Sequence, residues 1–163
     1  MKLSNIKDLY IQQLKDLYSA EKQLIKALPK MAKAASSQEL ADSINEHLKQ
    51  TEEHAERLED LLSEHDQTTR GPTCKGMEGL LEEGTEMIKV DADDEVRDAG
   101  LIAAAQRVEH YEIAGYGTAR TFAELIGDKK GARILQTTLD EEAETDQKLT
   151  RLAQGGVNAA ADK

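Results

Sequence analysis

The sequence predicts an all-α protein, a four-helix bundle with one long crossover that contains a short extra helix. Strong helix formers dominate the 163 residues, and aromatic residues make up only 3%. Four long segments repeat apolar residues at alternating spacings of four and three, which is typical of helices packed in a bundle. No run of β-branched residues bounded by turn residues predicts a strand.

The first long helix is expected to begin after Ser4, a candidate N-cap. Its apolar stripe has the spacing of a bundle helix, and Glu21 falls on that stripe. Pro29 lies inside the pattern. Because proline removes a backbone donor and its ring clashes with the preceding turn, we expect a kink or an interruption near residues 27–28.

The second long helix is followed by the crossover. Ser36 and Glu39 form a capping-box pattern at the start of this helix, which is expected to end by Asp66. Residues 67–91 then form a long connection that contains a short helical pattern, MEGLLEEGTEMIKV. A connection of this length can carry the chain from one end of a bundle to the other, so the second and third long helices are expected to run parallel.

The last two long helices complete the bundle. Residues 91–94 offer acidic N-caps for the third, and Gly127 is expected to follow its C-cap. Asp128 is expected to cap the fourth, which should end at a Gly-Gly pair. The bundle domain is therefore expected to span residues 1–155, with residues 156–163 as a flexible C-terminal tail.

The charge of the chain argues against two classes of partner. The formal net charge of −11 opposes binding to nucleic-acid phosphates and to anionic lipid. No apolar run approaches the ~20 residues that span a bilayer. The N-terminus lacks the apolar core and the cleavage site of a secretory signal. We therefore expect a cytoplasmic protein with no nucleic-acid and no membrane partner.

Acidic and histidine side chains interrupt the apolar seams. Glu112 lies in the middle of the stripe of the third long helix, Glu142 lies on that of the fourth, and His54 lies on that of the second. Ionised carboxylates do not enter an aliphatic core alone, because desolvation raises their pKa or destabilises the fold. A shared metal cation would compensate them. Alternatively, Glu21 could turn to solvent and pair with a nearby lysine, and His54 could be a structural histidine.

The two halves of the chain align at one constant offset, since adding 91 to the residue number superposes the core positions of both hairpins. The matched polar pairs are Glu21 with Glu112, Thr51 with Glu142, and His54 with Thr145. In symmetric di-metal bundles, two helices carry a Glu and the other two carry Glu-x-x-His. Here one such ligand set is divided between the two halves.

The candidate metal ligands are Glu21, His54, Glu112 and Glu142. Glu109 could be a ligand, an acceptor behind a ligand or a surface acid, and Asp146 could ligate from the next turn or orient a partner. His47 is expected to be structural or hydrogen-bonded to the acids, and residues 141–144 are expected to be mostly a solvated face. Carboxylate and imidazole suit iron, manganese or zinc.

Four stretches of the chain carry a family resemblance: LYSAEKQLIKALPKMAKAASS, MEGLLEEG, RDAGLIAAAQRVEHYEIAGYGT and LDEEAETDQKLT. They closely resemble the YciF-type bacterial stress-response proteins, a branch of the ferritin-like superfamily. The resemblance covers about residues 5–153. It implies a ferritin-like four-helix bundle with an added short helix, a homodimer, metal binding and a role in stress.

Carried over position by position, the resemblance implies a set of ligand slots at Glu21, His54, Glu112 and Glu142, with Glu109 and Asp146 as additional candidates. The chain departs from the family pattern in three places. Gln50 stands where relatives often have an acid, and Thr51 and Thr145 stand where ferritins have Glu and His. One or two ions per chain are therefore expected.

Two functions follow from these expectations. The first is a metal-carboxylate protein that oxidises ferrous iron or consumes peroxide. The second is a metal-free helical dimer, a structural or interaction protein with a vestigial metal site.

Overall fold

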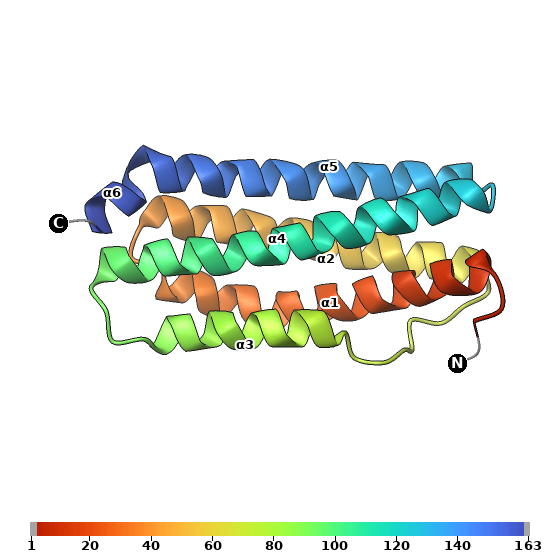
Figure 1. Ribbon diagram of the computed structural model, residues 1–163, viewed down its shortest axis with the longest axis horizontal. Helices are drawn as coiled ribbons and strands as arrows, with labels where there is room; N and C mark the ends of the chain where they lie inside the picture. Colours follow the sequence, from red (N-terminus) through yellow and green to blue (C-terminus); the bar gives the residue numbers. More distant parts are fainter. Residues whose placement is uncertain (1–2, 162–163) are drawn as a thin grey trace.

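Five helices of 15 residues or more form an elongated bundle in residues 3–161, the part of the chain that this computed structural model describes (Figure 1). One hairpin consists of α1 (Ile6–Ala34) and α2 (Gln38–Glu64), and the other of α4 (Asp94–Leu125) and α5 (Lys129–Leu152). Between them in sequence, α3 (Lys75–Lys89) lies along the outside, against α1 and α4. No strand occurs in these residues, so the predicted all-α class is confirmed.

The crossover through α3 makes α2 and α4 run in the same direction, as predicted (Figure 1). The two hairpins meet through two helix pairs, because α1 contacts α4 and α2 contacts α5. All four bundle helices therefore surround one central core. This arrangement confirms the predicted bundle with a short helix in its crossover.

The first helix starts one residue later than predicted. Asn5, not Ser4, is its N-cap, and the Asn5 side chain accepts a hydrogen bond from the backbone N of Asp8 at 2.9 Å. The Asp8 carboxylate accepts in turn from the backbone N of Ser4 at 2.8 Å. The predicted interruption at Pro29 is wrong, since α1 continues to Ala34. Pro29 lies on the exposed face, where water can satisfy the carbonyl that loses its backbone partner.

A buried carboxylate, Asp98 of α4, holds the turn between α1 and α2. Asp98 accepts hydrogen bonds from the backbone N and the hydroxyl of Ser36, at 2.9 and 2.7 Å, and from the backbone N of Ser37 at 2.7 Å. Ser36 is therefore occupied, and Ser37 caps α2 in its place by accepting from the backbone N of Leu40. The two hairpins are thus tied together at this end of the bundle.

The turn between α4 and α5 follows the prediction. Gly127 adopts a φ of +80°, and the backbone N of Asp128 donates to the carbonyl of Ala123 at 2.9 Å, which closes α4 with a Schellman motif. The Asp128 side chain then caps α5 by accepting from the backbone N of Gly131 at 2.8 Å.

The C-terminal segment differs from the expected tail. α5 ends at Leu152, and a π-helical turn at Ala153–Val157 leads into the short helix α6 (Asn158–Ala161), which contacts α4. A φ of +153° at Gly156 allows this change of direction. Helical structure thus extends beyond the Gly-Gly pair, and the last two residues of the expected tail, 162–163, lie outside the described residues.

The core consists of two apolar clusters with polar residues between them along each bundle helix. One cluster contains Leu24, Ile44, Leu101 and Leu149, and the other contains Leu14, Leu58, Ala119 and Leu135. Among the described residues, no helix is both long enough and apolar enough to cross a membrane.

Candidate metal centre

A layer of buried polar side chains crosses the middle of the bundle, and all four bundle helices contribute to it. Its ionisable members are at most 4% exposed. The layer contains Glu21 of α1, His47, Thr51 and His54 of α2, Glu109 and Glu112 of α4, and Glu142 and Thr145 of α5. Because it separates two aliphatic clusters, solvent does not screen its charges.

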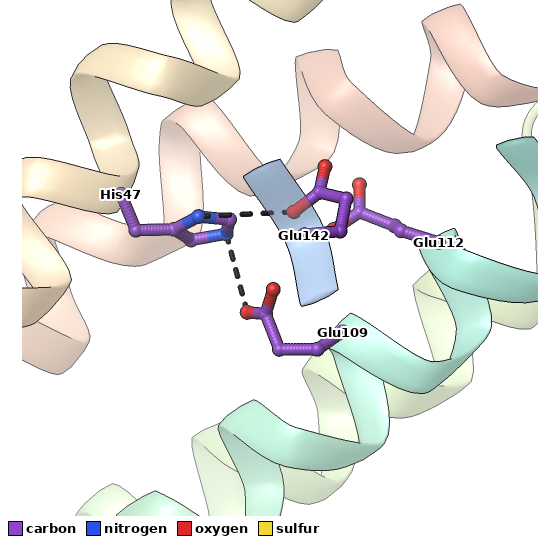
Figure 2. Close-up of side chains that lie close together, drawn as sticks. All are labelled: His47, Glu109, Glu112 and Glu142. Atoms are coloured by element: carbon purple, nitrogen blue, oxygen red, sulfur yellow. Dashed lines mark ion pairs between the residues drawn. The ribbon is translucent and has the colours of Figure 1, made fainter. Parts of the chain in front are cut away.

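Two groups in this layer have the spacing of a metal site. The first consists of Glu21, His54 and Glu142, and the second of His47, Glu109, Glu112 and Glu142. In each group, one ligand atom from every residue lies within 4.8 Å of the others. Figure 2 shows the second group, whose side chains point toward one another from three helices. Glu142 belongs to both groups, so its two oxygens could serve two ions.

His54 is held between carboxylates on both sides of its ring. Nδ1 lies 2.9 Å from Oε1 of Glu142 and 3.6 Å from Oε1 of Glu21. On the other side, Nε2 lies 2.8 Å from Oε2 of Glu141. A proton on Nε2 satisfies the bond to Glu141 and leaves Nδ1 directed into the first group, which is the usual orientation of a histidine ligand supported by a carboxylate.

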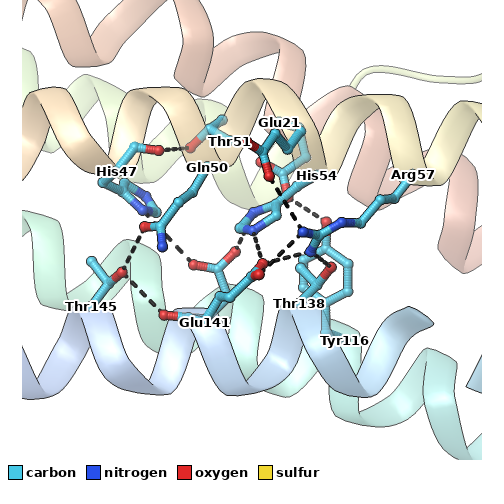
Figure 3. Close-up of polar contacts among 12 residues, drawn as sticks. Glu21, His47, Gln50, Thr51, His54, Arg57, Tyr116, Thr138, Glu141 and Thr145 are labelled. Atoms are coloured by element: carbon cyan, nitrogen blue, oxygen red, sulfur yellow. Dashed lines mark hydrogen bonds and ion pairs between the residues drawn. The ribbon is translucent and has the colours of Figure 1, made fainter. Parts of the chain in front are cut away.

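Arg57 fixes the position of Glu141 (Figure 3). Nη1 of Arg57 lies 2.5 Å from Oε2 of Glu141, and Nη2 lies 3.1 Å from Oε1. Nη1 also donates to the Thr138 hydroxyl at 3.0 Å. This two-point contact lowers the pKa of Glu141, because the bonds from Arg57 and His54 outweigh the effect of burial.

His47 approaches the second group from α2. Nε2 of His47 lies 3.3 Å from Oε1 of Glu109, and Nδ1 lies 4.0 Å from Oε2 of Glu142. Neither ring nitrogen has a hydrogen-bond partner within residues 3–161. Burial lowers the pKa of His47, so the ring is neutral at neutral pH and offers a lone pair.

Buried ligand atoms in these groups lack hydrogen-bond partners. Within residues 3–161, ten buried side-chain atoms have no partner, and nine of them, all except Nε of Arg120, belong to the two groups. The nine are Oε2 of Glu21, both nitrogens of His47, Nδ1 of His54, Oε2 of Glu109, and both oxygens of Glu112 and of Glu142. An unsatisfied buried polar group costs about 1–3 kcal/mol. Nδ1 of His54 and Oε1 of Glu142 lie 2.9 Å apart and pair when His54 is protonated, whereas the other seven atoms have no such partner. The layer is therefore suited to a cation.

Without a cation, the layer retains protons on its acids. Burial, and then the charges of neighbouring carboxylates, raises the pKa of Glu109 and Glu112 well above the usual value, and burial also raises that of Glu21. The pKa of Glu142 is lowered, since burial raises it but the contact with the protonated His54 outweighs that effect. A metal ion would have to displace protons from this layer.

His54 binds a proton tightly in the metal-free state. Burial disfavours the imidazolium, but the carboxylates of Glu142 and Glu21 outweigh it and raise the pKa of His54 to about 10. Besides its contact with His54, Glu21 accepts a hydrogen bond from the Tyr116 hydroxyl, which fixes the Glu21 side chain. The polar contacts of the layer thus hold its ligand atoms in place.

Of the six candidate ligands from the sequence, the structure brings together Glu21, His54, Glu109, Glu112 and Glu142. Asp146 lies in neither group. Its carboxylate accepts a hydrogen bond from Gln106 at 3.0 Å and lies 3.5 Å from Nε2 of the exposed His110. One turn beyond Glu142 on α5, Asp146 faces the rim of the bundle, where its side chain is 20% exposed.

Two residues at the candidate metal centre, His47 in a ligand group and Glu141 beside His54, were not among the candidate ligands. His47 was expected only as a structural or supporting histidine, although it lies four and seven residues before Thr51 and His54 on the same stripe. Glu141 was assigned to a solvated face. Its contact with His54 depends on how α2 and α5 pack, so no signal within the acidic run could have identified it.

The matched pairs of the 91-residue offset all lie in the polar layer, but the two halves are chemically unequal. The hydroxyl of Thr51 donates to the carbonyl of His47 at 2.9 Å, and that of Thr145 donates to the carbonyl of Glu141 at 3.1 Å. Both threonines therefore bond to their own helices, and both histidines of the layer come from α2 (Figure 3).

Comparison with known proteins assigns the chain to a family. The family described as "Domain of unknown function (DUF892)" matches residues 5–162. The chain is 48% identical over 163 residues to Protein YciF of Escherichia coli (strain K12), covering 99% of this chain and 98% of that protein.

Solved structures agree with this assignment. The crystal structure of the E. coli stress protein YciF superposes with a TM-score of 0.92 at 48% identity, over 96% of this chain and 99% of that one. YcfI from Rhodopseudomonas palustris, described as a candidate structural protein, superposes with a TM-score of 0.87 at 39% identity, over 91% and 95% of the two chains. The chain therefore belongs to the DUF892 family and is similar over nearly its whole length to the E. coli stress protein YciF.

Proposed function

We propose that this chain is a ferritin-like metal-carboxylate protein that acts in stress tolerance and binds one or two ions of iron, manganese or zinc. The observation that carries the proposal is the convergence of buried carboxylate and imidazole ligand atoms in one layer, most of them without a hydrogen-bond partner among the described residues. One ion would be held by Glu21, His54 and Glu142, and the other by His47, Glu109, Glu112 and Glu142. Carboxylate oxygens with imidazole nitrogens suit these metals.

The proposed chemistry is ferrous-iron oxidation or peroxide consumption, and the two can be combined in one reaction. Bound iron would supply one-electron transfer: two ferrous ions each lose one electron, and peroxide takes both with two protons, so that its O–O bond breaks and two waters form. The surrounding residues position the ligands. Tyr116 orients Glu21, and Glu141 orients His54. The aliphatic clusters on both sides exclude bulk water.

Peroxide consumption is tested by comparing the wild type with Glu142→Ala, both loaded with ferrous iron. We expect faster loss of peroxide with the wild type, because Glu142 contributes to both ligand groups. The protein should be purified without a chelator or a metal-affinity tag. Equal rates would remove the enzymatic part of the proposal and leave metal binding intact.

A second candidate function is a metal-free structural dimer. Two observations favour it. The similar R. palustris protein is described as a candidate structural protein, and the raised pKa values of Glu109 and Glu112 allow these acids to remain neutral without an ion. This function predicts no bound metal in purified protein. It also predicts that Glu112→Leu is neutral or stabilises the fold by about 1–4 kcal/mol, as when buried charges are replaced by apolar side chains.

Both candidate functions include a homodimer in the cytoplasm. The dimer is proposed from the resemblance to the YciF-type proteins, and light scattering of the purified chain would test it. A mass of one chain at micromolar concentration would contradict it.

A further inference from the structure

A small cavity lies between α1, α3 and α4, beside the candidate metal centre. Its volume is about 20 Å³, and about 10–15 Å³ is enough for one water-sized molecule. Apolar side chains from all three helices line it, among them Leu28, Leu81 and Ala105. Glu109 is its only charged lining residue.

Helix α3 is anchored over the groove between α1 and α4. At its start, the backbone N of Cys74 donates to the Ser19 hydroxyl of α1 at 2.9 Å, and the Cys74 thiol lies 2.8 Å from the Tyr111 hydroxyl of α4. Gly76 lets α3 approach α4 closely, since a Cβ there would lie 2.5 Å from the Tyr111 ring. Leu81, which is half-buried, lies between the cavity and solvent.

The lining determines what the cavity can hold. A buried water needs two to four polar partners, and an apolar cavity without them stays dry. Hydrogen peroxide has the same need, because its two O–H groups are donors. Only Glu109 offers polar atoms here. The cavity therefore favours a small apolar molecule.

Glu109 connects the cavity to the candidate metal centre. Its carboxylate belongs to the second ligand group, and its Oε2 has no hydrogen-bond partner among the described residues. A molecule in the cavity would therefore contact a side chain of the proposed metal site without passing through bulk water. Dioxygen is the small apolar oxidant that a buried redox centre can use.

We propose that this cavity binds dioxygen and leads it to the candidate metal centre. The purpose of the cavity rests on the proposed function, whereas dioxygen binding itself can be measured on metal-free protein. Helix α3, the extra element in the crossover, then has a specific role, since it converts the groove between α1 and α4 into a covered apolar site.

The binding test uses paramagnetic relaxation by dissolved dioxygen, read from methyl NMR signals of the metal-free protein under oxygen and under nitrogen. We expect oxygen to enhance relaxation of the cavity methyls of Leu28 and Ala105, which are 5% and 7% exposed, more than that of Ile11 and Ala132, which are each 8% exposed in the other apolar cluster. Equal enhancement in both clusters would overturn the proposal and leave metal binding untouched.

Two matched variants of α4 test the location. Ala105→Leu should fill the cavity and remove the selective enhancement at Leu28, whereas Ala103→Leu, at an exposed position of the same helix, should retain it. Retention of the enhancement in a folded Ala105→Leu protein would contradict the assignment. If Ala105→Leu does not fold, the comparison of methyl relaxation between the two apolar clusters of the wild type still tests dioxygen binding.

Ferrous-iron oxidation tests the delivery of dioxygen. In this reaction two ferrous ions lose one electron each, and dioxygen takes both with two protons to form hydrogen peroxide. Ala105→Leu should bind as much metal as the wild type and lose rate with dioxygen but not with added peroxide. An unchanged rate with dioxygen would overturn delivery, whereas absence of metal from the wild type would overturn the proposed function together with delivery and leave dioxygen binding in the cavity standing.

Discussion

Nδ1 of His54 lies 2.9 Å from Oε1 of Glu142, in the centre of the bundle. The two residues come from different hairpins, so this contact depends on the packing of α2 against α5. The preceding residue of α5, Glu141, holds the opposite nitrogen of the same ring at 2.8 Å. Glu141 thus orients the His54 ring through Nε2, and Nδ1 points toward the ligand groups.

Glu142→Ala should remove more metal than any other single ligand substitution, because Glu142 is the residue that both ligand groups share. We expect an affinity loss greater than the roughly 10–100-fold seen when a supporting residue is removed. Asp146→Ala is the matched control one turn further along α5, and it should retain wild-type affinity. Calorimetric titration with manganese measures both. Equal losses in the two variants would contradict the assignment of the site.

Glu141→Ala should weaken metal binding by about 10–100-fold, because His54 would lose the carboxylate that fixes its ring. Arg57 would also lose its partly buried partner, so the free energy of unfolding should be measured in parallel. Glu144→Ala, at an exposed position three residues later, is the control and should change neither quantity. Wild-type affinity in a folded Glu141→Ala protein would show that Glu141 does not orient the ligand.

The metal-free protein should lose stability as the pH rises from about 7 to about 9. The pKa of His54 is about 10 in the folded state against 6.5 in the unfolded chain. The folded state therefore binds more protons in this range, and the free energy of unfolding falls by up to about 1.4 kcal/mol per pH unit for each such proton. The raised pKa values of Glu109 and Glu112 act in the same direction.

Urea unfolding of metal-free protein at the two pH values measures this dependence. His54→Gln should show a shallower decrease, since the glutamine side chain does not titrate. Saturating metal should reverse the trend for the wild type, because metal uptake releases the protons of the layer. A metal-free wild type whose stability stays constant or rises over this range would be incompatible with the protonation described.

Asp98→Ala should destabilise the fold by about 2–4 kcal/mol, because it removes a charged acceptor that makes three hydrogen bonds to the turn between α1 and α2. Asp91→Ala, at an exposed position before α4, should stay within about 0.5 kcal/mol of the wild type. Chemical denaturation compares the two. Similar stabilities would indicate that the link between Asp98 and the first hairpin turn contributes little.

The periodicity of the chain predicted the bundle because each long helix repeats apolar residues along one face on both sides of the polar layer. The same stripes located Glu21, Glu112 and Glu142 in the interior, since a carboxylate among aliphatic residues is readily seen. His47 lies on such a stripe too, but a histidine there is compatible with ordinary packing. Its place in the second ligand group depends on how the helices pack, which brings Nε2 of His47 to 3.3 Å from Oε1 of Glu109.

Two features of the site depend on helix rotation and could not be read from spacing. Asp146 follows Glu142 by about one turn, yet the extra rotation moves it to the rim of the bundle beside Gln106. Glu141 precedes Glu142 and would be solvated on an isolated helix. The packing of α2 brings Arg57 and His54 to it instead.

The metal content of untagged protein, purified without chelator, tests the central claim most directly. Elemental analysis should find iron, manganese or zinc at about one or two ions per chain, as expected for two ligand groups that share Glu142, and the metal should be lost in Glu112→Ala. A wild type that contains no metal and gains none on dialysis against ferrous iron or manganese, together with a Glu112→Leu variant at least as stable, would contradict it.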